Sequence, residues 1–273
     1  MAPRTKRPPL NDLDVRAWMR FTKSWYVCNP PPRRRAELEH PAKFPEAMAQ
    51  EFIRFFTRAG EVVLDPFCGV GSALVAAEAC DRVGVGVELL PEFAARARAY
   101  GEPRASRRVL QGDARQAVDL CRAAGVEEVH YVLTSPPYWD MLRHTRGNVR
   151  SAQKERQARG LRTTYSEDAQ DLGNITDYDG YLDALTAILA DLRRLLAPGR
   201  YLTVVAQNVR VRSGEVRPLA WDLAARLSRV YTFKGERLWL QDNKRLGCWG
   251  WPAEFVTNVH HHYCLNFKHD RGG

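Results

Sequence analysis

Short apolar runs alternate with helix-like segments through the middle of the chain. The runs at residues 61–66, 83–88, 107–111 and 129–134 are rich in Val and Leu, which is typical of buried strands. The intervening segments 73–80, 91–99 and 114–123 carry apolar residues at helical spacing. This alternation predicts an α/β fold with a doubly wound, mostly parallel sheet.

The pattern continues towards both ends of the chain. It predicts helices at 46–57, 178–196 and 218–228 and a fifth strand at 200–206. Residues 237–240 and 259–267 predict a C-terminal antiparallel hairpin. We therefore expect a parallel sheet that ends in an antiparallel hairpin.

Composition divides the chain into an arm, a domain and a long loop. Residues 1–36 are rich in Pro and Arg and predict a loose basic arm, part of which packs down through Trp18, Trp25 and Tyr26. Residues 37–273 predict a single domain with no repeats. Residues 139–177 form a connection far longer than the roughly 2–6 residues that are usual in such folds, and loops of this kind are often functional.

A glycine-containing segment, Asp65-Pro-Phe-Cys-Gly-Val-Gly-Ser72, joins the first predicted strand of the α/β core to its helix. A strand, a glycine turn and a helix are the usual layout of a nucleotide-binding crossover. Glu88 ends the next strand, 19 residues after Gly69, and a carboxylate there suits two ribose hydroxyls. Leu74 stands where a dinucleotide fingerprint has its third glycine, so a ribose is favoured over a pyrophosphate.

A second motif, Thr134-Ser-Pro-Pro-Tyr-Trp139, follows the predicted strand at 129–134. Two prolines stop a strand, because neither has an N–H group to donate. A rigid turn of this kind, with a hydroxyl and a flat ring, could hold an exocyclic amine and stack the ring that bears it. A plain strand-ending turn is the alternative for the hexapeptide taken alone.

Together, these segments resemble the amino-methylating DNA methyltransferases, which use S-adenosylmethionine and act on cytosine N4 or adenine N6. The matching segments are spread over residues 40–138: 65–72, Glu88 with its strand, 112–114, 135–138 and 40–45. The cofactor motif comes before the Ser-Pro-Pro-Tyr motif. The resemblance implies a Rossmann-like methyltransferase fold and S-adenosylhomocysteine as the product.

The resemblance also implies roles for individual residues. Those implied for the cofactor site are Lys43, Asp65, Phe67, Cys68, Gly69, Gly71, Glu88 and Asp113, with Cys68 interpreted as a small packing residue. Asp113 would hold the adenine amino group, and a helix N-cap is the alternative. Ser135, Pro136, Pro137 and Tyr138 are the implied catalytic residues. The Ser135 hydroxyl and the Pro136 carbonyl would orient the amine, while Tyr138 stacks on the flipped base.

The target atom is only partly fixed by these residues. Ser135 stands where adenine methylases usually carry Asp or Asn, which favours cytosine N4. Adenine N6 is the closest alternative, followed by an RNA methyltransferase and by a catalytically silent DNA-binding subunit. Methylation of cytosine C5 is excluded, because it needs a nucleophilic Cys in a Pro-Cys motif that the chain lacks.

Charge favours a nucleic-acid partner. The net charge is +9, and only seven of the 41 basic residues are Lys. Arginine suits contacts to phosphates and base edges. The residues predicted to contact double-stranded DNA are Arg143, Arg146, Arg150, Lys154, Arg156, Arg159, Arg162, Arg210 and Arg212. A solvated loop is the alternative for the cluster between 141 and 166, and a restriction endonuclease is a candidate protein partner.

The remaining features argue for an ordinary cytoplasmic protein. The six cysteines show no metal spacing, so we expect reduced thiols and no metal site. His260, His261 and His262 predict surface imidazoles on a strand, since alternation separates adjacent ones. Trp249 and Trp251 suit either base stacking or packing within the hairpin. No apolar run is long enough to span a membrane, and we expect a monomer or a weak homodimer.

Overall fold

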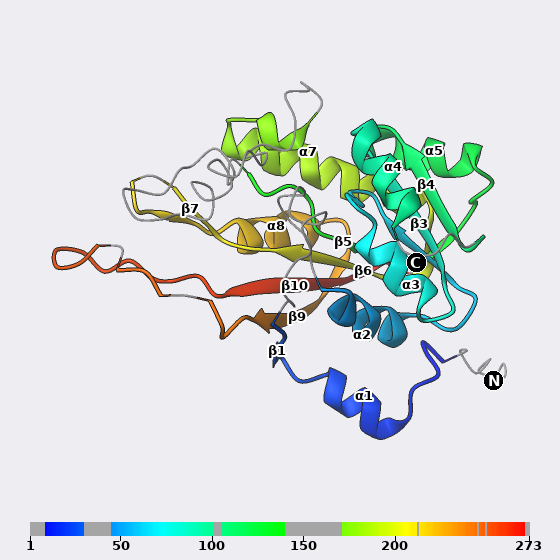
Figure 1. Cartoon of the computed structure of the whole chain (residues 1–273), viewed down its shortest axis with the longest axis horizontal. Helices are drawn as coiled ribbons and strands as arrows, with labels where there is room; N and C mark the ends of the chain where they lie inside the picture. The colour runs from blue at the N-terminus through cyan, green and yellow to red at the C-terminus, as the bar shows by residue number, and fades with distance from the viewer. Residues whose placement is uncertain are drawn as a thin grey trace, which may run out of the picture.

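The computed structural model describes residues 9–29, 45–100, 105–139, 171–211, 213–244, 246–248 and 250–270. Its main sheet has eight strands in the order β1-β9-β10-β6-β5-β2-β3-β4 (Figure 1). The strands are β1 (Trp25–Val27), β2 (Val62–Asp65), β3 (Val83–Glu88), β4 (Arg107–Gln111), β5 (Val129–Thr134), β6 (Leu196–Ala206), β9 (Thr232–Leu240) and β10 (His261–Lys268).

The sheet is parallel except around β10, which runs antiparallel to both β6 and β9. The predicted α/β fold with a C-terminal antiparallel hairpin is therefore confirmed. Strand β2 lies between β3 and β5, so the chain changes direction across the sheet there. In open α/β sheets, ligands bind at such switch points, beyond the carboxyl ends of the strands.

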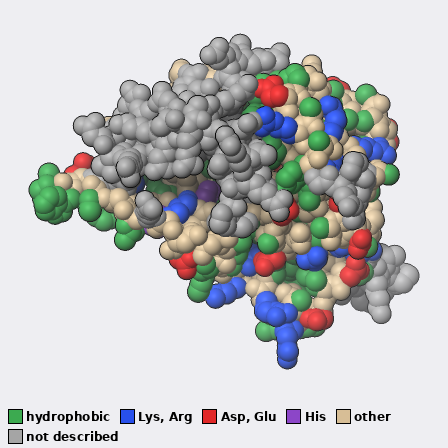
Figure 2. Space-filling view, in the orientation of Figure 1, with side chains coloured by type: hydrophobic (Ala, Val, Ile, Leu, Met, Phe, Trp, Pro, Cys, Tyr) green, Lys and Arg blue, Asp and Glu red, His purple; other side chains and the backbone are tan. Residues whose placement is uncertain are grey.

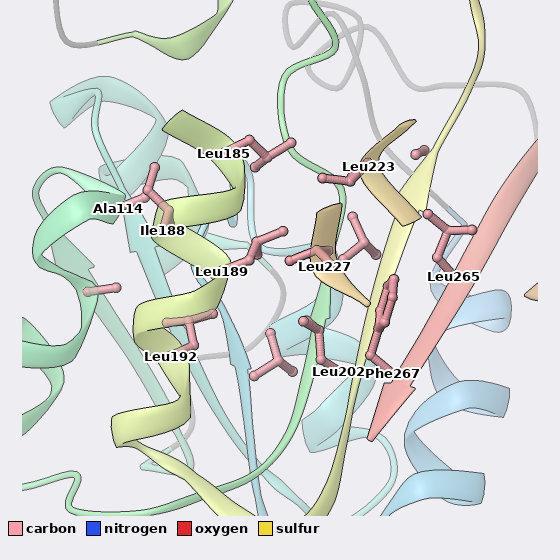
Figure 3. Packing of buried hydrophobic residues seen from close by; sticks show 14 of the residues in the cluster. Ala114, Leu185, Ile188, Leu189, Leu192, Leu202, Leu223, Leu227, Leu265 and Phe267 are labelled. Carbon is pink, nitrogen blue, oxygen red and sulfur yellow. The ribbon is translucent and has the colours of Figure 1, made fainter. Parts of the chain in front are cut away.

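Helices cover both faces of the sheet. One buried cluster joins residues of α1 (Val15–Phe21), α2 (Glu46–Phe56), α3 (Ser72–Glu78) and α4 (Pro91–Ala99). The other joins residues of α5 (Ala117–Ala123), α7 (Tyr178–Asp191) and α8 (Leu219–Leu227). Figure 3 shows Leu185 and Leu189 of α7 pointing towards Leu202 on β6 and Phe267 on β10. Their packing fixes the sheet between two helical layers.

The predicted elements differ from the observed ones mainly at their ends. The helix predicted at 178–196 stops at Asp191 and continues as the short 3-10 helix η4 (Leu192–Arg194), after which β6 begins at Leu196. Strand β9 begins at Thr232, five residues before the predicted start. Short 3-10 turns, η2 (Ala114–Gln116) and η3 (Leu172–Asn174), precede α5 and α7.

The described part of the N-terminal arm forms a helix and a short strand. Asp14 caps α1 by accepting a hydrogen bond from Ala17 N (2.7 Å), and β1 pairs in parallel with β9. Arg237 of β9 holds this segment, since its guanidinium lies 4.0 Å from the Phe21 ring and 4.4 Å from the Tyr26 ring. The part of the arm that was expected to pack down lies within residues 9–29, where Arg237, a residue distant in sequence, supplies contacts.

Two hairpins extend the sheet edge that carries the carboxyl ends of β5 and β6 (Figure 1). Residues 208–217, whose arginines predict a basic loop, contain β7 (Val209–Arg210) and β8 (Val216–Arg217), which pair antiparallel. The β9–β10 connection, residues 241–260, projects from the body of the molecule, and we call it the finger. Within the described ranges, no helix is both long and apolar enough to cross a bilayer.

Candidate active site

The glycine loop that follows β2 is held by backbone hydrogen bonds to the neighbouring strand. Cys68 N donates to the Val87 carbonyl (3.0 Å), and Gly71 N donates to the Cys68 carbonyl (2.8 Å). Gly71 has a φ of 87°, which L side chains rarely adopt, and it is the N-cap of α3. The loop thus turns sharply and brings backbone to the carboxyl end of the sheet.

Glu88 stands at the tip of β3 with its carboxylate facing this loop. One oxygen accepts a hydrogen bond from Gly69 N (2.9 Å) and the other accepts one from Leu90 N (3.0 Å). Burial raises the pKa of Glu88 to about 7, although both of these hydrogen bonds act in the opposite direction. Each oxygen retains a lone pair for a further donor.

Asp65 connects the cofactor motif to the Ser-Pro-Pro-Tyr motif. Its Oδ1 accepts a hydrogen bond from Thr134 Oγ1 (2.6 Å) and another from Phe67 N (3.1 Å). Burial raises the pKa of Asp65 to about 7, and the nearby Glu88 carboxylate acts in the same direction. Thr134, which the sequence analysis did not single out, therefore fixes one motif against the other.

Cys68 is a packing residue, as predicted. Its side chain is buried, and burial raises the pKa of its thiol well above the usual value. A Cβ atom added at Gly86 of β3 would lie 2.7 Å from both the Cβ and the Sγ of Cys68. The absence of a side chain at Gly86 thus lets the glycine loop lie directly on β3.

We predict that Gly86→Ala destabilises the protein by about 1–3 kcal/mol, because the added methyl group must displace Cys68 and its loop. Denaturant unfolding measures the free energy. Adding Cys68→Gly should recover part of the loss, since it removes the two atoms that clash. Equal stability of Gly86→Ala and the wild type would contradict the packing described here.

The turn that follows β5 is fixed by two tyrosines. Tyr138 Oη lies 3.2 Å from Ser135 Oγ and donates to the Val205 carbonyl (3.3 Å). Tyr181 of α7 donates its hydroxyl to the Pro137 carbonyl (2.7 Å). Neither Val205 nor Tyr181 was predicted to take part, because both contacts join residues more than 40 positions apart. Ser135 is held half-buried at the sheet edge.

Tyr138 is more buried than its predicted role suggests. We predicted that its ring stacks on the flipped base, but in this structure the side chain is only 6% exposed. In this conformation the hydroxyl anchors the turn, and burial raises the pKa of Tyr138. The ring also lies 6.3 Å from that of His262. Stacking of Tyr138 on a flipped base therefore stays a prediction.

His262 was predicted as a surface residue, and that prediction was wrong. Its ring stacks on Trp239 at 4.4 Å, and burial lowers its pKa to about 3, so the imidazole is neutral. Nδ1 is buried and has no hydrogen-bond partner. Strand alternation puts His262 on the same face as the buried Cys264, which is the signal that sequence reasoning overlooked.

Asp113 caps a helix, which was the alternative interpretation. Its Oδ1 accepts a hydrogen bond from Arg115 N (2.8 Å), and its Oδ2 pairs with the Arg115 guanidinium (2.8 Å). The residue follows β4 at the same sheet edge as Glu88. Both oxygens have protein partners, so contact with an adenine amino group stays a prediction.

Arg210 does not have the exposed side chain that we predicted for a DNA contact. Its guanidinium is buried, and Nη2 donates to the Thr257 carbonyl of the finger. The correction has a simple cause, because Arg210 lies in β7 and faces the finger rather than solvent. The other predicted positions, Lys43, Arg143, Arg146, Arg150, Lys154, Arg156, Arg159, Arg162 and Arg212, lie outside the described residues.

The residues at this edge fit an adenosine-type cofactor. Glu88 offers two adjacent acceptor oxygens on a carboxylate that has lost most of its hydration, which suits the paired hydroxyls of a ribose. The glycine loop brings backbone close to the same point. Parallel strands with a glycine loop after β2 and an acidic residue at the end of β3 are the layout expected of the S-adenosylmethionine-dependent methyltransferase fold.

Comparison with known proteins finds similarity to one family of DNA methylases. The DNA methylase family of the N6/N4 type matches residues 7–99. The type II methyltransferase M.BglI of Bacillus subtilis is 34% identical over 85 residues, or 30% of this chain and 23% of that protein. The orphan methyltransferase M.BamHII of Bacillus amyloliquefaciens is 36% identical over 55 residues, which are 20% of this chain and 21% of that protein. The family model thus matches about a third of the chain, and the chain is similar to these amino-methyltransferases over that part.

These alignments cover less than a quarter of each curated relative. A solved structure supports the fold over a longer stretch. The methyltransferase in complex with the Trm112 activator of Haloferax volcanii has a TM-score of 0.50, is 12% identical, and matches 83% of this chain and 89% of its own. At that identity the likeness concerns the fold alone.

Proposed function

We propose that the protein transfers a methyl group from S-adenosylmethionine to the exocyclic N4 of cytosine in double-stranded DNA. One observation carries the proposal. The hydrogen bond between Asp65, where β2 ends, and Thr134, the last residue of β5 before Ser135, brings the two motifs together at one sheet edge. Adenine N6 is the second candidate, because the same family acts on both amines.

Positioning supplies most of the catalysis in this proposal. Bound S-adenosylmethionine supplies a methyl group on a positively charged sulfur and leaves as S-adenosylhomocysteine. Ser135 Oγ and the Pro136 carbonyl accept hydrogen bonds from the amine, which directs the nitrogen lone pair towards the methyl group. Both acceptors also stabilise the positive charge that develops on nitrogen, before one proton is released.

The other two residues of the motif support this geometry. The Pro137 carbonyl is bonded to Tyr181, which fixes the turn, and the Tyr138 hydroxyl holds Ser135 in place. A paired base cannot reach such a turn, so the target base must leave the duplex. Stacking of the flipped base on Tyr138 would require the buried ring to become accessible. A restriction endonuclease partner stays a prediction.

Nucleoside analysis by mass spectrometry tests the function. Plasmid DNA would be incubated with the protein and S-adenosylmethionine, digested and compared with DNA treated with Glu88→Ala. We expect N4-methylcytosine with the wild type alone, and sequencing of the product would map the methylated site. N6-methyladenine would select the second candidate. A product with no methylated base would reject DNA methylation and favour a silent binding subunit.

DNA affinity should fall steeply with salt if the arginines between 143 and 162 contact phosphates. Six such contacts would cost about a thousandfold in affinity between 50 and 200 mM salt. Replacing Arg150, Arg156 and Arg159 by Gln should flatten the slope, as measured by fluorescence anisotropy. The matched control replaces Arg20, Arg193 and Arg229, which are exposed on other parts of the molecule. An equal salt dependence in both triple variants would argue against phosphate contacts by the arginines between 143 and 162.

A further inference from the structure

The tip of the finger is strongly apolar and faces solvent. Leu246, Trp251 and Phe255 are 80%, 82% and 91% exposed, and among the described residues they are the most exposed large hydrophobic side chains. Figure 2 shows hydrophobic atoms gathered at the far left end of the molecule, where Figure 1 places the finger. Exposed aromatic side chains of this size usually mark an interaction site.

The finger has a defined internal structure. Asn258 accepts a hydrogen bond from Gly247 N (2.9 Å) and donates to the Gly247 carbonyl (3.0 Å), which ties its two sides together. A turn closes the tip, where Glu254 N donates to the Gly250 carbonyl (2.7 Å). A Cβ atom at Gly250 would collide with the Glu254 backbone. The aromatic side chains are thus presented on a preformed support, which lowers the entropic cost of binding.

The finger extends from the catalytic edge of the sheet. Leu240, where β9 ends, pairs with His261 at the start of β10, and Tyr263 pairs with Ala206 at the end of β6. Strand β6 in turn pairs with β5 through Val204 and Thr134, the residue before Ser135. A duplex whose base reaches Ser135 therefore passes the root of the finger.

The charge of the chain favours DNA over a second copy of the chain as the partner of the finger. The β7–β8 hairpin lies against it, since Arg210 bonds to Thr257 and a Cβ atom at Gly214 would lie 3.7 Å from Glu254 Oε2. In this hairpin Arg210 is buried against the finger and Arg217 Nη1 lies 3.4 Å from Glu215 Oε1, so the charge that favours DNA is that of the chain as a whole, whose net charge is +9. An apolar tip on a basic chain complements stacked bases between phosphates, whereas two copies of a basic chain repel each other.

We propose that the finger enters the duplex beside the target base and that Trp251 and Phe255 stack on the bases that flipping leaves exposed. This inference rests on the proposed function. Apolar side chains inserted between base steps separate them, and stacking on an aromatic ring contributes roughly 1–3 kcal/mol per base. The finger thus stabilises the opened duplex, while the turn at Ser135 holds the base that has left it.

The test compares two duplexes with the Trp251→Ala/Phe255→Ala variant. Both carry the site mapped on the plasmid, and in the second an abasic residue faces the target base, so that no pair has to open. We expect the variant to lose at least tenfold in single-turnover rate on the paired duplex and less than threefold on the abasic one. Trp221→Ala is the control, because Trp221 is 59% exposed on α8, outside the finger.

Two results would overturn the proposal while leaving the methyltransferase function intact. Equal losses on both duplexes would make the finger a general DNA contact, and no loss on either would remove it from DNA binding. Sedimentation analysis could give a third contrary result. If the wild type is a dimer and the double variant is a monomer, a second copy of the chain covers the tip of the finger.

If the wild type methylates no DNA, a DNA-binding measurement tests the role of the finger instead. Anisotropy would then be measured on a 30-base-pair duplex, about three helical turns, with and without a central abasic residue. A tenfold loss of affinity by the double variant on the intact duplex alone would support the finger although the proposed function had failed. Unchanged affinity would overturn both.

Discussion

Replacing Glu88 by Gln should weaken binding of S-adenosylmethionine by about a hundredfold at pH 8. Glu88 is the buried acceptor at the tip of β3, and a hydrogen bond to a charged group contributes roughly 1.5–3 kcal/mol. The amide keeps the shape of the side chain but loses the charge and one acceptor. Isothermal titration calorimetry measures the change, with Glu92→Gln, which alters a nearby charge, as the control.

The same experiment has a pH dependence of defined sign. The pKa of Glu88 is raised to about 7, so the carboxylate proposed to accept both ribose hydroxyls is present above pH 7 and is lost as the pH falls. Cofactor affinity of the wild type should therefore fall between pH 8 and pH 6, and that of Glu88→Gln should change little. A pH dependence that survives in the variant would assign the titration to Asp65, whose pKa is also about 7.

Local sequence was sufficient to predict the central part of the fold. From β2 to β5, each strand is a short apolar run and each helix has its own apolar spacing, so the elements were located to within a few residues. The glycine loop and Glu88 were predictable for a related reason. Their function depends on strand ends, and neighbouring parallel strands bring those ends together without further information.

Elements that depend on distant partners were missed. Strand β1 has only three residues and exists because it pairs with β9, more than 200 positions away. Phe21 of helix α1 stacks on Phe55, with the ring centroids 3.9 Å apart, and the Arg237 guanidinium lies over the Phe21 ring. None of these contacts leaves a periodic pattern of apolar residues in the local sequence. The short β7–β8 hairpin was predicted as a loop for the same reason, because its pairing and the contact between Arg210 and the finger are not local.

Burial was the hardest property of the site to predict. Tyr138 was predicted to stack on a base, Arg210 to contact DNA and His262 to lie at the surface of a strand, and all three side chains are more buried than those roles suggest. In the structure, Tyr138 and Arg210 bond to backbone carbonyls, and His262 stacks on Trp239. Whether a polar side chain is turned inwards depends on which acceptors or rings lie opposite, and only the tertiary structure supplies them.

Replacing Ser135 by Ala should reduce the single-turnover rate of methyl transfer by about a hundredfold and leave the affinity for S-adenosylmethionine unchanged. A neutral hydrogen bond contributes only about 0.5–1.5 kcal/mol in ordinary settings, but removing a preorganised acceptor can cost about 3 kcal/mol in the transition state. Ser135 lies outside the glycine loop, so the cofactor should bind as in the wild type. Rapid-quench assays with saturating DNA and cofactor measure the rate.

Tyr138→Phe separates positioning from direct contact in the same assay. Truncation to Ala would leave a cavity at this buried position and destabilise the protein by about 3–5 kcal/mol, whereas Phe removes only the hydroxyl that contacts Ser135 and Val205. If that hydroxyl holds Ser135 in place, Tyr138→Phe should slow transfer by about tenfold, and combining it with Ser135→Ala should add nothing. Wild-type rates in both single variants would mean that this turn does not hold the reacting amine, and the proposed function would lose its catalytic residues.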